Sequence, residues 1–154
     1  MARPVRITVV GAGRCDTATA SIAERVGAGI ARRGGVLVCG GLAGVMEAAA
    51  RGASEAGGLT VGILPGDSAD DANAYIGVPI PTGMGHARNV VNVLAADAVV
   101  GVGGSYGTVS EMALAVKMGK PVFAVSPPFS GEGVVEVDDA EQAVELAFAA
   151  VGRR

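Results

Sequence analysis

The sequence of 154 residues predicts a single α/β domain, a doubly wound Rossmann-like fold whose mainly parallel sheet has helices on both faces. Short valine-rich apolar runs alternate along the chain with longer stretches of helical period. The apolar runs lack a clean two-residue alternation, which is typical of strands buried on both faces of a parallel sheet. Turns containing glycine or proline separate the two kinds of segment. We expect one domain over residues 1–154.

The elements follow from these patterns in chain order. The expected strands cover residues 5–10, 36–39, 59–64, 76–80, 98–102, 121–125 and 134–137. The expected helices cover residues 17–33, 45–56 and 85–96, a stretch that begins near residue 108, and residues 138–151. Asp16 is the expected N-cap of the first helix, and Asp138 with Glu141 forms the expected cap of the last. The acidic segment 67–75 is expected to be a surface loop.

Composition excludes several classes of function. Hydrophobic residues make up 50% of the chain and charged residues 18%, which excludes a disordered protein and indicates extensive burial, part of it against another subunit. The net charge of −3 and the 3% of aromatic residues argue against nucleic acid as a partner. Two cysteines and one histidine make a metal site improbable. With no apolar stretch of membrane-spanning length and no signal peptide, we expect a cytoplasmic protein without membrane contact.

The stretch AVVGVGGSYGTVSEMAL over residues 98–114 carries the main functional signal. A buried strand ends at Gly103-Gly104, and after Ser105-Tyr106-Gly107 a helix is expected to begin near Thr108, with Thr108 and Glu111 as a capping pair. A glycine-rich turn before a helix presents free backbone N–H groups beside the positive end of the helix dipole. This arrangement predicts an anion site, most often for phosphate.

A second loop repeats the pattern. Gly40-Gly41-Leu42-Ala43-Gly44 has the same GGxxG form and also connects a strand to a helix. In parallel sheets, ligands bind beyond the carboxyl ends of the strands, so both loops are expected at one site. The first loop, with Gly11 and Gly13, lacks the third glycine of a dinucleotide fingerprint, so an NAD site is not expected. A tight turn and a phosphate-contacting loop remain equal interpretations of it.

Two charged residues are candidates for chemistry at this site. Glu111 either completes the capping pair with Thr108 or presents a carboxylate at the rim of the anion site. Arg88 falls in the first turn of its helix, where the dipole disfavours a cation. It is therefore either an ordinary solvated arginine or a guanidinium that grips phosphate or pairs with Glu111.

Three motifs resemble the LONELY GUY superfamily, once labelled lysine decarboxylases, which includes phosphoribohydrolases acting on cytokinin riboside monophosphates. The motifs are GGLAGVMEAAARGASEAGGLTVGILPG at residues 40–66, GHARN at 85–89 and GGSYGTVSE at 103–111. The resemblance implies phosphate binding by Gly103, Gly104, Gly107 and Thr108, and catalysis by Glu111 with Arg88. The implied reaction cleaves the N-glycosidic bond of a nucleoside 5′-monophosphate and requires no cofactor. No lysine lies where a decarboxylase would bind pyridoxal phosphate.

At two positions the sequence departs from the hydrolase pattern, which favours another branch of the superfamily. Val102 replaces the proline before the glycines, and Asn89 replaces the lysine after Arg88. The short chain is more similar to the compact branch of the superfamily that includes molybdenum-cofactor carrier proteins. The resemblance thus implies a ligand that is either molybdopterin or a nucleoside monophosphate, and an assembly that is a homodimer or homotetramer. We expect ligand binding by Gly11, Gly13, Gly40, Gly41, Gly44, Arg88, Gly103, Gly104, Ser105, Gly107 and Thr108.

Overall fold

The computed structural model describes residues 2–152, so Met1 and residues 153–154, the two ends of the expected domain, lie outside the described part. Its described strands form a seven-stranded sheet in the order β4-β3-β2-β1-β5-β6-β7. Each neighbouring pair is parallel. The strands are β1 (Arg6–Gly11), β2 (Val36–Cys39), β3 (Thr60–Leu64), β4 (Val78–Pro81), β5 (Ala98–Val102), β6 (Val122–Val125) and β7 (Val134–Val137).

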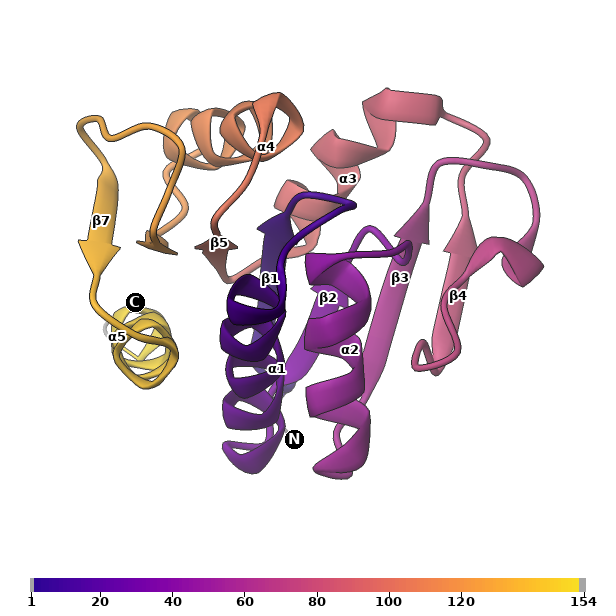
Figure 1. The fold of residues 1–154 in the computed structure, drawn as a ribbon, viewed down its shortest axis with the longest axis horizontal. Helices are drawn as coiled ribbons and strands as arrows, with labels where there is room; N and C mark the ends of the chain where they lie inside the picture. Colours follow the sequence, from indigo (N-terminus) through magenta and orange to yellow (C-terminus); the bar gives the residue numbers. More distant parts are fainter. Residues whose placement is uncertain (1, 153–154) are drawn as a thin grey trace.

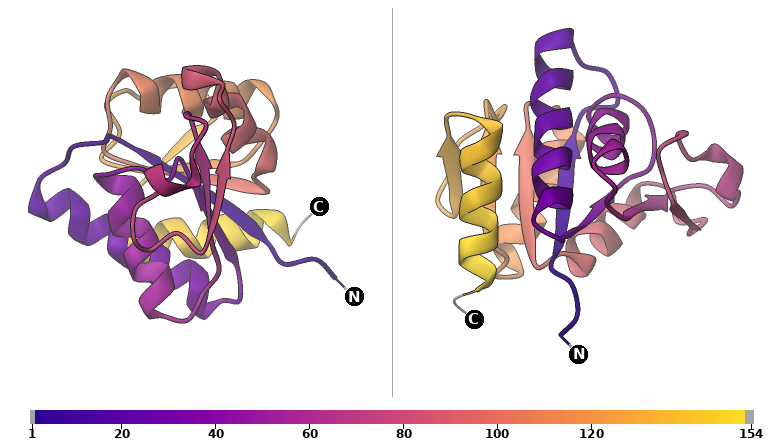
Figure 2. Two further views of the ribbon diagram at one scale, coloured as in Figure 1. Left: turned by 90° about the vertical axis from the view of Figure 1, so that its right-hand side faces the viewer. Right: turned by 90° about the horizontal axis from the view of Figure 1, so that it is seen from below.

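Helices cover both faces of this sheet, which confirms the predicted fold class (Figures 1 and 2). The left view of Figure 2 shows α3 and α4 on one side of the strands and the other three α-helices on the opposite side. The helices are α1 (Thr17–Arg32), α2 (Val45–Glu55), α3 (Arg88–Ala95), α4 (Tyr106–Lys117) and α5 (Ala140–Val151), with short 3₁₀ turns at η1 (Ala69–Asp71) and η2 (Gly85–Ala87).

Two apolar layers hold the helices to the sheet. On one face, alternate strand side chains such as Ile7 pack against α1, α2 and α5, where Ile30 and Val144 are buried. On the other face, Val99 packs with Val93 of α3 and Met112 of α4. Because β1, β5 and β6 contribute side chains to both layers, these strands read as continuous apolar runs in the sequence.

Glycines bring α1 and α2 unusually close together. A Cβ atom at Gly27 would lie 1.9 Å from the Ala49 carbonyl oxygen, and one at Gly52 would lie 2.0 Å from the Glu24 carbonyl oxygen. Only glycine permits two helix backbones to approach this closely. The close packing fixes the N-termini of both helices, and hence the loops that follow β1 and β2, at one edge of the sheet.

Most predicted element boundaries agree with the structure to within two residues, and Asp16 caps α1 by accepting a hydrogen bond from the Thr19 N–H (2.7 Å). The cap of α5 is shifted by one residue. Asp139, rather than Asp138, accepts from the Gln142 N–H (2.8 Å), and the Gln142 side chain accepts from the Asp138 N–H. Glutamine thus replaces the expected Glu141 as the reciprocal cap partner. Within residues 2–152, no helix is long and apolar enough to cross a membrane.

Candidate functional site

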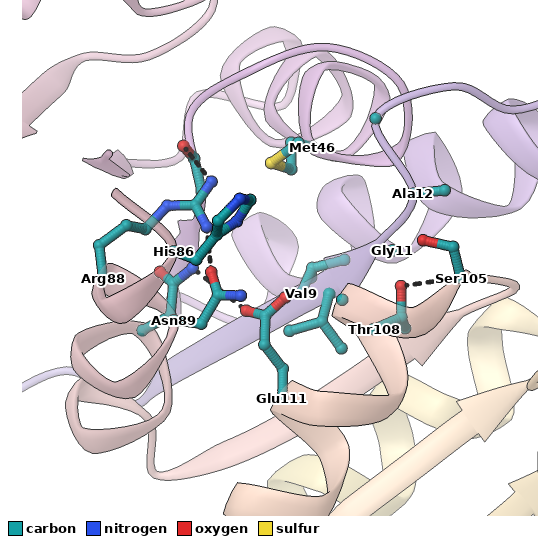
Figure 3. A pocket seen from close by; sticks show the side chains of 15 residues that line it. Val9, Gly11, Ala12, Met46, His86, Arg88, Asn89, Ser105, Thr108 and Glu111 are labelled. Atoms are coloured by element: carbon teal, nitrogen blue, oxygen red, sulfur yellow. Dashed lines mark hydrogen bonds between the residues drawn. The ribbon is translucent and has the colours of Figure 1, made fainter. Parts of the chain in front are cut away.

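A polar cavity lies at the carboxyl edge of the sheet, beside the point where the strand order reverses between β1 and β5 (Figure 3). This is where ligands bind in open parallel sheets. Its volume is about 150 Å³. Its walls come from the end of β1 and the following loop, the start of α2, η2, α3 and the first turns of α4. The lining residues are Val9, Val10, Gly11, Ala12, Gly13, Gly40, Met46, His86, Arg88, Asn89, Asn92, Ser105, Gly107, Thr108 and Glu111.

The first turn of α4 forms one wall, and its cap differs from the predicted one. The helix begins at Tyr106, with Ser105 as N-cap in the extended conformation. Thr108 is the third helical residue, and its hydroxyl oxygen accepts a hydrogen bond from the Ser105 N–H (3.2 Å). Thr108 therefore pairs with Ser105, and the predicted capping pair of Thr108 with Glu111 is wrong. Glu111 is left free for another role.

The predicted glycines fall into two groups. Gly11, Gly13, Gly40 and Gly107 line the cavity. The other four shape the loops instead, and each has a positive φ: they are Gly41 (77°), Gly44 (66°), Gly103 (54°) and Gly104 (131°). Gly44 is the clearest case, because a Cβ atom there would lie 2.3 Å from the Ala12 carbonyl oxygen of the neighbouring loop.

The two GGxxG loops differ in geometry despite their matching letters. Gly44 lies outside α2 as its N-cap, in the left-handed region. Gly107 is the second residue inside α4, and a Cβ atom there would have no neighbour within 4 Å. Gly44 is therefore required for the chain conformation of the loop before α2, whereas Gly107 leaves open space beside the cavity.

Arg88 reaches into the site and is held there by protein oxygens. Its side chain is buried, with Nε donating to the Ile63 carbonyl (2.8 Å), Nη2 to the Gly40 carbonyl (3.5 Å) and Nη1 to Asn89 Oδ1. Burial lowers the pKa of its guanidinium, while the nearby Glu111 raises it. The interpretation of Arg88 as a solvated surface residue is therefore wrong. Within residues 2–152, the side-chain hydrogen bonds of Arg88 go to Ile63, Gly40 and Asn89 rather than to Glu111.

Glu111 faces Arg88 across the cavity floor and is 7% exposed (Figure 3). Its Oε2 accepts a hydrogen bond from Asn92 Nδ2 (3.3 Å). Burial raises the pKa of Glu111 to about 7, against the opposing effects of Arg88 and the Asn92 hydrogen bond. A carboxyl group that titrates near neutral pH inside a cavity is typical of a functional site.

Sequence reasoning missed Asn92, which is 1% exposed. Among residues 2–152, its buried Oδ1 has no hydrogen-bond partner, whereas its backbone carbonyl accepts from the Thr8 hydroxyl (2.8 Å). The sequence did contain a signal for Asn92, because it follows Arg88 by four residues and so lies on the same face of a helix. Helical spacing of apolar residues predicts that Ala87, Val90, Val91 and Leu94 form the buried face of this helix, but Ala87 and Leu94 are exposed and Val90 and Val91 are half-buried.

The single histidine and the cysteines have subordinate positions. His86 lines the cavity from η2 and is exposed. Cys39 is buried, and burial raises the pKa of its thiol to about 11, so it stays protonated. Within residues 2–152, no three His, Cys, Asp or Glu side chains are grouped to hold a metal ion.

Comparison with known proteins identifies relatives of the whole chain. The model of the SLOG cluster4 family matches residues 4–150. An uncharacterized protein of Archaeoglobus fulgidus is 49% identical over 144 residues, which cover 94% of this chain and 95% of that protein. The molybdenum cofactor binding protein of Rippkaea orientalis has a similar structure, with a TM-score of 0.92 and 36% identity over 97% of this chain and 98% of the other.

A second solved structure, the Moco carrier protein of Chlamydomonas reinhardtii, has a TM-score of 0.90 and 34% identity over 99% of this chain and 100% of the other. These matches confirm the resemblance to the compact branch that includes molybdenum-cofactor carriers. They also agree with the observed seven-stranded parallel architecture.

Proposed function

Because the chain belongs to the SLOG cluster4 family, we propose that it binds a phosphate-bearing small ligand of the molybdopterin type in the cavity beside α4. One observation carries this proposal. The N-terminus of α4, the glycine loops after β1 and β2, and the buried Arg88 converge on one cavity at the carboxyl edge of the sheet. The similarity to a molybdenum cofactor binding protein and a Moco carrier protein over nearly the whole chain supports the class of ligand.

The chemistry of the walls suits a phosphate ester. The first turn of α4 offers backbone N–H groups and the positive end of a 12-residue helix. Arg88 adds a fixed positive charge. A guanidinium has five N–H donors, and three are engaged by Ile63, Asn89 and Gly40, so two remain for a ligand.

The size of the cavity limits which part of the ligand it holds. A pocket of about 150 Å³ is below the roughly 300–1,000 Å³ of sites that enclose a drug-sized molecule. A cavity of ~150 Å³ engineered into a protein interior accommodates one benzene molecule, so this volume holds only a small group. We therefore assign the cavity to the phosphate-bearing end of the ligand. Any molybdenum would enter as cargo on the ligand.

Substitution at Gly107 tests the proposal, because its surroundings are open. An aspartate in the first turn of a helix interacts favourably with the dipole, so Gly107→Asp leaves folding intact, but its charge repels a phosphate. Gly107→Asn is the neutral control of the same shape. The assay mixes protein with isolated molybdopterin, removes free ligand by gel filtration and measures the retained pterin by fluorescence. Retention by the aspartate variant is expected to be at least about tenfold below that of the asparagine variant, a difference of about 1.4 kcal/mol.

Equal retention by the two variants would contradict the proposed phosphate site. No retention by the wild-type protein would contradict the proposed ligand class.

A second candidate function rests on Glu111. Its buried carboxyl group, beside Asn92 and opposite Arg88, also suits a nucleoside 5′-monophosphate phosphoribohydrolase. In that reaction the bond between the base and the ribose breaks with its electron pair on the base nitrogen, water gives its hydroxyl group to the anomeric carbon and a proton to the base, and free base and ribose 5-phosphate leave. Ionised Glu111 would stabilise the positive charge that develops on the ribose ring, as carboxylates do in glycoside hydrolysis.

The two candidates are separated by incubating the protein with a panel of nucleoside 5′-monophosphates and scoring released base by chromatography. A hydrolase releases base with a rate that rises with pH through about 7, as Glu111 ionises, and the Glu111→Gln variant loses this activity. Release of no base from any member of the panel, by protein that retains molybdopterin, leaves binding as the function.

A further inference from the structure

A second depression adjoins the cavity at the N-terminal end of α4. It is lined by Ser105, Tyr106, Val109, Pro128 and Phe129 and has a volume of about 490 Å³. We call it the Tyr106 depression. Ser105 lines both this depression and the polar cavity, so the two meet at the N-cap of the helix. Apart from Ser105, the lining is apolar or aromatic.

Tyr106 is the conspicuous residue of this surface, because 94% of it is exposed. Aromatic residues are scarce in the chain, which has two tyrosines, three phenylalanines and no tryptophan. The other tyrosine, Tyr75, is half-buried and its ring lies 5.8 Å from the Arg51 guanidinium. Nothing within the described chain covers the ring of Tyr106, so both of its faces can contact another molecule.

Another part of the lining, formed by Pro128 and Phe129, is fixed. Phe129 is half-buried and packs against the apolar layer beneath α4. The segment before it leaves β6 through Ser126, a non-glycine residue with a φ of 47°, and then Pro127 and Pro128, whose rings restrict the backbone. This apolar wall and the exposed ring of Tyr106 line the same depression, which suits a flat molecule.

Helix geometry explains how one ligand reaches both places. At about 100° per residue, Gly107, Thr108 and Glu111 share the face of α4 that lines the cavity, whereas Tyr106 and Val109 project from the opposite face. The two faces meet only at the helix end. A phosphate bound to the N–H groups at that end can therefore have the rest of its molecule pass over Ser105 to Tyr106.

We propose that the Tyr106 depression binds the planar heteroaromatic ring of the ligand, which stacks on Tyr106 while its phosphate end occupies the polar cavity. This inference rests on the proposed function, and it supplies the space that the small cavity lacks. It also assigns ring recognition to stacking, which tolerates any flat heterocycle.

The test compares ligands with and without a ring. Dissociation constants of molybdopterin, adenosine 5′-monophosphate and ribose 5-phosphate are measured by calorimetry for wild-type protein and for the Tyr106→Ala and Tyr106→Phe variants. Leu59→Ala is the matched control, because Leu59 is also an exposed apolar residue (50%) but precedes β3, at the amino edge of the sheet.

Tyr106→Ala is expected to weaken binding of the ring-bearing ligands about 5- to 150-fold, as for loss of one stacked base, and to leave ribose 5-phosphate unchanged. Tyr106→Phe and Leu59→Ala are expected to bind like the wild type. Wild-type affinity for molybdopterin that survives in Tyr106→Ala overturns the ring site but not the proposed function. If molybdopterin does not bind but the other two ligands do, the proposed function is defeated. The comparison of adenosine 5′-monophosphate with ribose 5-phosphate then decides the ring site.

Two further results would overturn the inference. One is wild-type protein that binds neither ring-bearing ligand more tightly than ribose 5-phosphate. The other is a change in subunit number on sedimentation of Tyr106→Ala, which would assign the exposed ring to contact with a second copy of the chain.

Discussion

The Glu111 carboxyl group should make the stability of the fold fall as pH rises, and Glu111→Gln should remove that dependence. In the folded chain burial raises the pKa of Glu111 to about 7, whereas the unfolded value is the ordinary 4.5. The folded state therefore binds a proton more tightly than the unfolded state. Its stability is highest below pH 4.5 as far as this group is concerned, and declines as pH rises from about 4.5 through about 7.

The size of the effect follows from the pKa difference. Each pKa unit corresponds to about 1.36 kcal/mol, so a rise from 4.5 to about 7 amounts to a loss on the order of 3 kcal/mol between pH 4.5 and pH 8. Other carboxylates work in the opposite direction. The pKa of Asp97 is lowered by its hydrogen bonds with Arg6 and Arg3, which outweigh its desolvation by burial, so the stability it contributes is lost as pH falls. These contributions are common to the wild type and Glu111→Gln, so they cancel in the difference between the two free energies of unfolding.

The assay is urea unfolding at pH 5 and pH 8 for the wild type and Glu111→Gln, with Glu145→Gln as a control on the exposed face of α5. The free energy of unfolding of Glu111→Gln, relative to the wild type, should be higher at pH 8 than at pH 5 by a few kcal/mol. The Glu145→Gln control should show no such change. A Glu111→Gln difference that is the same at both pH values would refute the assignment of a buried, proton-binding carboxyl group.

Three further predictions follow from the cavity walls. Gly107→Ala fills open space within a helix, so it should raise the melting temperature by about 1–4 °C while weakening molybdopterin binding, whereas Gly152→Ala at the end of α5 should leave binding unchanged. Asn92→Leu removes the donor to Glu111 Oε2, and should move the carboxyl titration, followed by NMR, above about pH 7. Thr108→Val removes the acceptor for the Ser105 N–H and should cost about 0.5–2 kcal/mol in the free energy of unfolding.

The architecture could be predicted because its signals are local. Valine runs, glycine turns and the Asp16 cap each report on a few consecutive residues, and they gave the α/β alternation and most boundaries. The first turn of α4 could not be predicted in the same way. Ser105-x-x-Thr108 and Thr108-x-x-Glu111 both fit the spacing of a cap, and the choice depends on burial of Glu111 against Asn92 of another helix.

The face of α3 shows the same limit. Hydrophobic spacing is a good guide when a helix buries an apolar face against a core. Here the inward face of α3 carries Arg88 and Asn92 into a polar cavity. The spacing of the apolar residues therefore predicted the wrong inward face, and Leu94 is 57% exposed. The cavity lining was predicted where glycine motifs mark it, at Gly11, Gly13, Gly40 and Gly107. It was missed at Ala12 and Asn92, which lie outside the three motifs, and at Met46 and Asn89, which lie inside them but were given no binding role.

The central claim is that the cavity beside α4 holds the phosphate of a larger ligand. The most direct measurement is equilibrium dialysis of the wild-type protein against molybdopterin and against its dephosphorylated form. The phosphate should strengthen binding at least about 100-fold, or roughly 2.7 kcal/mol, and Gly107→Asp should abolish that difference. Equal affinity for the two forms would contradict the claim.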